Sequence, residues 1–97
     1  MGELAFLQED RLFDGECVRF KGVDGDREVT CGVTLVALKE CDPELPRHGL
    51  VPAEAFLSSF DKLVIPIHDA ARAKYSRGEF ESEGAVEIMV HRRDLAP

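Results

Sequence analysis

The sequence has no tryptophan, one tyrosine and no hydrophobic run of the length that crosses a membrane. A transmembrane helix needs about 20 mostly apolar residues in succession, so no membrane contact is expected. Residues 1–7 lack the basic and apolar regions of a signal peptide. The three cysteines form an odd set, and in a chain without an export signal they are expected to remain free thiols. These absences together predict a cytoplasmic protein.

Motifs for metals, phosphates and catalysis are absent as well. No glycine-rich phosphate loop is present, and the residues that commonly bind zinc follow no zinc-binding spacing. Those residues are Cys17, Cys31, Cys41, His48, His68 and His91. No cysteine has a local partner that would activate it as a nucleophile. We therefore expect no metal, no cofactor and no catalytic residue, and an enzymatic activity is disfavoured.

The sequence is acidic, with a net charge of −7 and 32% charged residues. A negative protein repels a phosphate backbone unless its basic residues are concentrated in one patch. The basic clusters are short, at Arg72-Lys74-Arg77 and Arg92-Arg93. The first of them is typical of a helix C-terminus, where cations complement the helix dipole. No nucleic-acid partner is expected.

The clearest β signal is a pair of alternating runs at 16–23 and 27–33, separated by Asp24-Gly25-Asp26. An Asp-Gly pair between such runs predicts a hairpin. We expect Gly22 to pair with Arg27. This register places four apolar side chains on one face, with Phe20 opposite Val29 and Val18 opposite Cys31. It also places Cys17 on the other face, which makes Cys17 the more exposed of these two cysteines and a poor disulfide partner for Cys31.

The helical signal is strongest at 52–77, where apolar residues recur with helical spacing. Pro52 suits the start of a helix and Gly78 suits its end. Pro66 lies inside the pattern, but the apolar face keeps its phase across it. We predict one kinked helix, with two helices meeting near Ile65 as the alternative. Residues 35–40 either extend the preceding strand or, as we favour, form a short helix capped by Thr34.

A short strand at 4–7 and a final strand at 84–91 complete the pattern, and residues 92–97 are expected to fray. Residues 1–97 then form a single α+β domain with the order β-β-β-(short α)-α-β. The expected architecture is an antiparallel sheet with the long kinked helix on one face. Its core should combine apolar residues of the sheet and of the helix: Val18, Phe20, Val29, Cys31, Val33, Phe56, Phe60, Val64, Ile67, Ala71, Tyr75, Val86, Ile88 and Val90.

Two places remain for function in this architecture. One helix covers one face of a sheet, so the second face meets solvent or a partner, either another protein or a second copy in a homodimer. The residues expected on this interaction face are Cys17, Arg19, Lys21, Thr30, Glu87, Met89 and His91. The other place is the proline kink, where His68 and Asp69 are neighbours. They form either a small polar site or a solvated helix surface.

The pattern resembles a family of small bacterial proteins catalogued as domain of unknown function 1488. The matching positions are Leu4-x-Phe6, Val18-x-Phe20, Asp24-Gly25, Val29-x-Cys31-x-Val33-Thr34, Leu38, Ala55-Phe56, Phe60, Ala70-Ala71 and Gly78. Pro66 and the proline-rich loop at 41–52 depart from the family pattern. The resemblance implies a small, self-contained α+β domain and no established activity. The missing catalytic motifs and the uncovered face of the sheet make a non-catalytic protein-binding or regulatory module the leading functional hypothesis. The alternative is a small ligand-binding protein or minor enzyme that uses the helix-kink region near His68.

Overall fold

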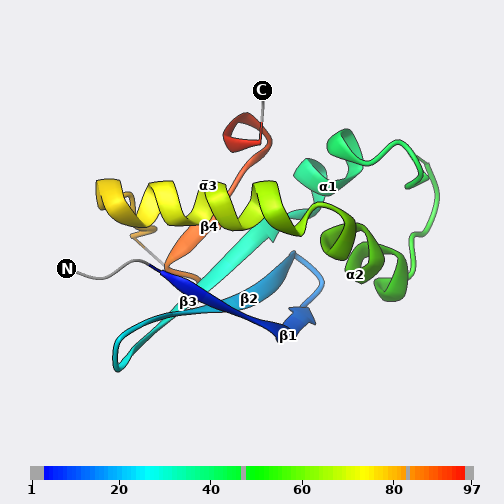
Figure 1. Ribbon diagram of the computed structural model, residues 1–97. Helices are drawn as coiled ribbons and strands as arrows, with labels where there is room; N and C mark the ends of the chain where they lie inside the picture. Colours follow the sequence, from blue (N-terminus) through cyan, green and yellow to red (C-terminus); the bar gives the residue numbers. More distant parts are fainter. Residues whose placement is uncertain (1–3, 47, 83, 96–97) are drawn as a thin grey trace.

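The computed structural model describes residues 4–46, 48–82 and 84–95, with residues 7–10 described as backbone only. The elements, in chain order, are β1 (Ala5–Phe13), β2 (Cys17–Asp24), β3 (Arg27–Thr34), α1 (Leu35–Cys41), α2 (Ala53–Lys62), α3 (Val64–Arg77), β4 (Ile88–Val90) and the 3-10 turn η1 (Arg92–Asp94). Helix α3 lies along one face of the sheet (Figure 1). The predicted two-layer α+β class is confirmed. No helix in these described ranges is long and apolar enough to cross a membrane.

The sheet has four strands in the order β1-β2-β3-β4. The first three are antiparallel neighbours, but β4 runs parallel to β3, with Ile88 beside Cys31. The sheet is therefore mixed, and the expectation of a wholly antiparallel sheet is wrong. Parallel neighbours need a long crossover connection, and the three helices between β3 and β4 provide it. Strand β1 is also longer than the predicted 4–7, with an irregular register between Leu7 and Leu12.

The β2–β3 hairpin closes on a two-residue turn, with Asp24 paired to Arg27. Gly25 has a φ of 63°, as two-residue hairpin turns require. The observed pairs are Phe20 with Cys31 and Val18 with Val33, so the predicted register is wrong by two residues. Side chains alternate with a period of two, and the predicted faces are therefore correct even though the partners differ.

The core lies between the helices and the inner face of the sheet. Most of the predicted core residues are buried there, and Leu4, Ala37, Leu38 and Leu45 join them. Val64 and Tyr75 pack at its margin. Leu4 fills the space beside Gly22, where an added Cβ would lie 2.7 Å from the Leu4 Cγ atom. Val86 is buried, but it lies on the other side of the sheet.

The predicted kinked helix is in fact two helices, as the alternative anticipated. The chain leaves helical geometry at Leu63, with φ −104° and ψ 15°, so the break precedes Pro66 by three residues. Pro66 then falls in the first turn of α3, where a backbone N–H has no intrahelical acceptor and proline costs little. The helix ladder resumes at once with a 3.0 Å bond from the Ile67 N–H to the Leu63 carbonyl.

Thr34 caps α1 as predicted, since its hydroxyl accepts a 3.0 Å hydrogen bond from the Ala37 N–H. The C-terminal region differs from prediction. Strand β4 spans only 88–90, and residues 92–94 form η1 in place of a frayed tail. Positions 96 and 97 lie outside the described residues.

A buried ion pair fastens η1 to α3. Lys74 Nζ donates to the Asp94 carboxylate at 2.9 Å and to the Met89 carbonyl oxygen at 2.9 Å. The side chains of Lys74 and Asp94 are only 5% and 14% exposed. Lys74 therefore lies in the interior of the protein, although it also belongs to the basic run that the sequence predicts at this helix C-terminus.

Candidate functional site

Part of the second face of the sheet carries a hollow between described side chains of β1, β2 and β3. Leu12, Arg19, Lys21 and Thr30 line a hollow there with a volume of about 380 Å³. The strand register accounts for this grouping, because Arg19 pairs with Leu12 of β1 and Lys21 pairs with Thr30 of β3. Leu12 is 58% exposed, so an apolar side chain stands in the open beside the hollow. We call these four residues the open sheet face.

Both cations of the open sheet face have acidic partners. Arg19 Nε lies 2.6 Å from the Asp14 carboxylate, and Lys21 Nζ lies 3.3 Å from Glu28. Asp14 also accepts the backbone N–H groups of Glu16 and Cys17. Burial alone would raise the pKa of Asp14, but these hydrogen bonds and Arg19 lower the pKa overall. The face is therefore polar at its rim without a large excess of either charge.

The rest of the second face is covered by the segment that follows α3. This segment is tied to the sheet by 2.8 Å hydrogen bonds from the Glu81 N–H to the Glu87 carbonyl and from the Glu87 N–H to the Thr30 carbonyl. Gly32 of β3 lies directly beneath it. A Cβ atom added there would lie 3.1 Å from Cys17 Sγ and 3.2 Å from Met89 Sδ. The expectation that the whole second face is open is therefore wrong.

Cys17 is buried under this cover, with 2% of its surface exposed against 0% for Cys31. The prediction that Cys17 is the more exposed of the two assumed an open face, and that assumption is wrong at Cys17. Burial and the charge of Asp14 raise the pKa of the Cys17 thiol to about 11. Cys31, in the core, has a pKa raised by burial to about 12. Both thiols stay protonated near neutral pH, and the thiolate is the nucleophilic form.

The remaining residues of the predicted interaction face lie in the C-terminal region. Glu87 accepts hydrogen bonds from the Thr30 N–H at 3.2 Å and from Arg27 at 3.0 Å. Met89 is half-buried over Gly32, and the His91 N–H donates to Asp94 at 2.8 Å. The structure thus separates the seven residues. Three of them, Arg19, Lys21 and Thr30, belong to the open sheet face, and the others belong to the covered part or its margin.

His68 packs in an aromatic cluster between α3, α2 and the sheet. Its ring stacks on Phe6 of β1 with 4.0 Å between ring centres and 12° between planes. The Phe20 and Phe60 rings lie 5.5 and 6.2 Å away. Burial lowers the pKa of His68, and the charge of Arg72 lowers it further. His68 is therefore positioned by hydrophobic packing and is biased toward its neutral form.

Asp69 takes a different direction from His68. It is exposed and pairs with Arg72 at 3.1 Å, one helical turn further along. Arg72 also donates to the Leu4 carbonyl at 3.1 Å. The two members of the sequence-predicted polar site are thus neighbours in the chain but contact different groups.

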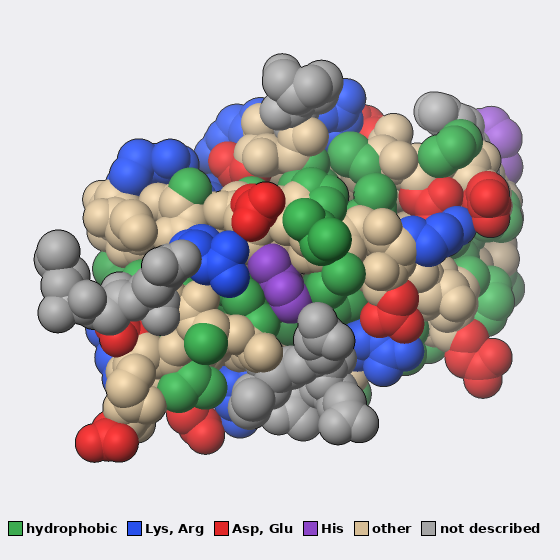
Figure 2. Space-filling view, viewed as in Figure 1, with side chains coloured by type: hydrophobic (Ala, Val, Ile, Leu, Met, Phe, Trp, Pro, Cys, Tyr) green, Lys and Arg blue, Asp and Glu red, His purple; other side chains and the backbone are tan. Residues whose placement is uncertain are grey.

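Other polar groups meet at points that the sequence pattern did not single out. Buried Asp42 binds Lys62 at 3.0 Å and accepts the Glu44 N–H, which fastens the 42–52 loop to α2. Among the side chains that the structure describes, which exclude those of residues 7–10, no three His, Cys, Asp or Glu are grouped as metal ligands would be. Acidic and basic side chains are interspersed on the face seen in Figure 2, around a histidine near its centre.

The buried position of Lys74 was predictable from the sequence. It follows Ile67 and Ala71 by seven and three residues, which places it on the buried side of α3. Asp42 carried no comparable signal, because the loop around it has no periodicity.

Residues 7–88 match the family described as Protein of unknown function (DUF1488). The chain belongs to the DUF1488 family. This confirms the resemblance drawn from the sequence. The crystal structure of a DUF1488 protein of unknown function from Shewanella loihica PV-4 has a TM-score of 0.80 at 19% sequence identity. The similarity covers 95% of this chain and 96% of that chain. At this identity the likeness shows a shared DUF1488 fold. No curated protein matches the chain.

Proposed function

We propose that this DUF1488 protein is a cytoplasmic, non-catalytic protein-binding module that uses the open sheet face. The observation that carries the proposal is Leu12, which is 58% exposed at the edge of a hollow lined by Arg19, Lys21 and Thr30. Protein interfaces commonly join a small apolar centre to a polar rim. The open sheet face combines one exposed apolar side chain, Leu12, with the polar side chains of Arg19, Lys21 and Thr30.

The state of the nucleophilic groups supports a binding role. The Cys17 thiol is buried and its pKa is raised to about 11. His68 contacts aromatic rings, and its neighbour Asp69 is turned to Arg72. His68 and Asp69 are not paired with each other. Cys17 Sγ does donate to the Asp14 carboxylate at 3.7 Å, but the thiol pKa is raised and the carboxylate pKa is lowered, so this pair is not set up as a nucleophile and its base would be.

A second copy of the chain is the first partner to test. In a two-fold dimer the same surface meets itself, so Leu12 of each subunit would approach the hollow of the other. The ion pairs of Arg19 with Asp14 and Lys21 with Glu28 present both signs at the rim. Such a rim permits contact with an identical surface without strong repulsion.

The test compares Leu12→Gln with Val36→Gln. Leu12 and Val36 are 58% and 59% exposed, but Val36 lies on α1, away from the open sheet face. Both changes remove exposed apolar surface without adding charge. Light scattering on the purified wild type and the two variants measures self-association, and quantitative capture from a native lysate measures binding to other proteins.

We expect Leu12→Gln to weaken self-association or a specific capture, whereas Val36→Gln leaves it unchanged. Equal behaviour of the two variants in both assays would remove the open sheet face from consideration. A wild-type protein that stays monomeric and captures nothing reproducible would contradict a binding role altogether.

A further inference from the structure

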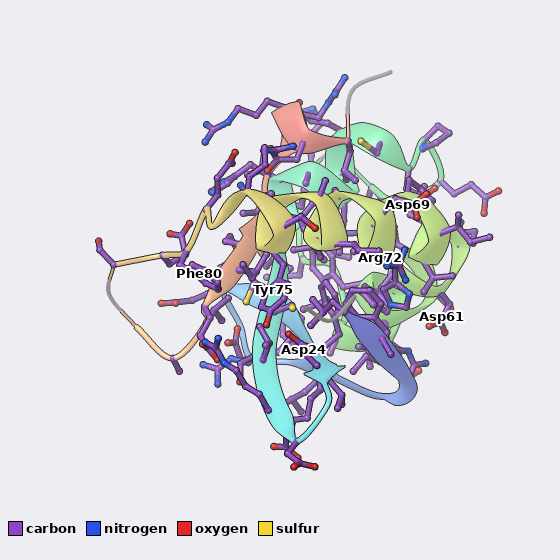
Figure 3. All side chains as sticks on the ribbon, turned by 60° about the vertical axis from the view of Figure 1, so that its left-hand side comes forward. Asp24, Asp61, Asp69, Arg72, Tyr75 and Phe80 are labelled. Carbon is purple, nitrogen blue, oxygen red and sulfur yellow. The ribbon has the colours of Figure 1, made fainter. Side chains whose placement is uncertain are left out.

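A second cluster lies at the turn end of the β2–β3 hairpin, on the side facing α3. It joins Asp24 and Arg27 of the hairpin to Tyr75 of α3 and to Phe80 and Glu87 of the following segment. Figure 3 shows Tyr75 reaching toward Asp24, with Phe80 beside it. The Tyr75 hydroxyl donates a 2.6 Å hydrogen bond to the Asp24 carboxylate. The phenol ring is therefore held in a defined position.

The two aromatic rings form a corner that holds a cation. Tyr75 and Phe80 are 5.7 Å apart at their centres and nearly perpendicular, at 82°. The guanidinium carbon of Arg27 lies 6.0 Å from the Tyr75 ring and 5.7 Å from the Phe80 ring. Arg27 Nη2 also donates to Glu87 at 3.0 Å. Two ring faces and a carboxylate are the groups that recognise a guanidinium in proteins.

The arginine is held by contacts that are each weak. The side chains of Arg27 and Glu87 are 55% and 37% exposed, and Phe80 is 43% exposed. Ion pairs and cation–π contacts stabilise little at such exposure because water competes for the same groups. Arg27 is also at the end of a hairpin, where its side chain can return to solvent without disturbing the core. The site therefore has the groups that bind a guanidinium, and the Arg27 guanidinium that occupies it can move into solvent.

We propose that Tyr75, Phe80 and Glu87 form an arginine-binding site, which Arg27 occupies within the chain and which an arginine on a basic partner protein takes in its place. Charge favours such a partner. The protein has a net charge of −7, so its field attracts a basic segment. With Arg27 displaced, the Glu87 carboxylate loses its Arg27 partner and can pair with the incoming cation, while Asp24 still holds the Tyr75 hydroxyl. This site adjoins the open sheet face where Glu87 accepts the Thr30 N–H, but it is formed by other side chains. Its test is therefore independent of the function proposed above.

The natural reporter for this site is Tyr75, which is the only tyrosine in a chain without tryptophan. Arg27→Ala empties the site, and N-acetyl-argininamide is the probe. If Arg27 fills the site about nine-tenths of the time, the empty site binds the probe about tenfold more tightly than the wild type does. Tyrosine fluorescence measures this binding, with circular dichroism to confirm that each variant is folded.

Arg77→Ala is the matched control. Arg77 is 56% exposed and pairs with Glu79, so its loss changes the net charge and an exposed ion pair in the same way but leaves the aromatic corner filled. We expect the roughly tenfold gain in affinity for the probe in Arg27→Ala but not in Arg77→Ala. Binding should weaken when Phe80→Leu is added to that variant, and N-acetyl-lysinamide should bind less well because it lacks the planar guanidinium.

Two results would overturn the proposal. Equal gains in affinity for N-acetyl-argininamide in Arg27→Ala and Arg77→Ala would show a general charge effect. A folded Arg27→Ala variant that binds the probe no better than the wild type would show that Arg27 only braces the hairpin against α3.

Discussion

Replacing Lys74 by methionine tests the buried ion pair between α3 and η1. Methionine keeps the length of the side chain but leaves the Asp94 carboxylate without its cation. Lys74 is 5% exposed and Asp94 is 14% exposed, so water compensates little for the loss. Breaking a buried pair by removing one partner costs about 3–5 kcal/mol. We expect the lower end, about 3 kcal/mol, because the His91 N–H still donates to Asp94.

Thermal unfolding followed by circular dichroism measures this change. For a domain of this size, each kcal/mol shifts Tm by about 4–8 °C, so Lys74→Met should lower Tm by about 12–24 °C near pH 7. The matched control is Lys21→Met. Lys21 also forms an ion pair, but it is 38% exposed and its partner Glu28 is 66% exposed. Exposed pairs contribute about 0–1 kcal/mol, so the control should shift Tm by a few degrees at most.

The effect of Lys74→Met should depend on pH in a definite direction. Burial alone would raise the pKa of Asp94, but the His91 N–H and Lys74 lower it overall. A lowered carboxylate pKa stabilises the fold above the unfolded-state value, and this stability is lost as pH falls through the folded-state value. The difference in Tm between the wild type and Lys74→Met should therefore become smaller below about pH 4.

Adding Asp94→Asn to Lys74→Met removes the unpaired charge while retaining an acceptor for the His91 N–H. The double variant should recover most of the lost Tm. A Lys74→Met variant as stable as Lys21→Met would refute the reasoning. A double variant no more stable than Lys74→Met would show that the cost comes from packing, not from charge.

Three further changes test other features. Thr34→Ala should cost about 1 kcal/mol in urea unfolding by removing the cap of α1, with Thr34→Ser close to wild type. Gly22→Ala places a Cβ 2.7 Å from Leu4 and should cost about 1–3 kcal/mol by overpacking; an unchanged unfolding midpoint would contradict the packing of Leu4 there. In the native protein near pH 8, a thiol reagent should modify partly exposed Cys41 long before Cys17, whose pKa is raised to about 11. Similar modification rates at Cys41 and Cys17 would show that Cys17 is not covered.

Local patterns predicted the sheet faces and the core well. The alternation around Phe20 and Val29 identified the inner face, because moving a register by two residues leaves every side chain on its side. Thr34 was recognised as a cap because a single hydrogen bond to the helix N-terminus decides that position. These features depend on residues close together in the chain, and the sequence displays them directly.

Features that depend on distant packing were not predictable in the same way. The apolar stripe has the same phase in one kinked helix and in two helices, so it did not reveal the break at Leu63. The partners of Lys74 come from β4 and η1, which periodicity in α3 does not show. The interaction face was predicted only in part, because nothing in the local sequence indicates that Val86 and Met89 lie over Gly32 beside Cys17. The aromatic corner around Arg27 was missed because its members come from three separate segments.

The parallel pairing of β4 with β3 has a consequence for how the chain reaches this structure. Strands β1 to β3 are neighbours in the chain and form a meander from local contacts, whereas Thr30 and Glu87 are 57 residues apart. Contacts of such separation form late, because a long loop must close before they stabilise anything. During synthesis, the three-stranded meander can therefore assemble while β3 still has a free edge. That edge is closed only once residues 88–90 have left the ribosome, and until then its backbone N–H and C=O groups are free to pair with another strand.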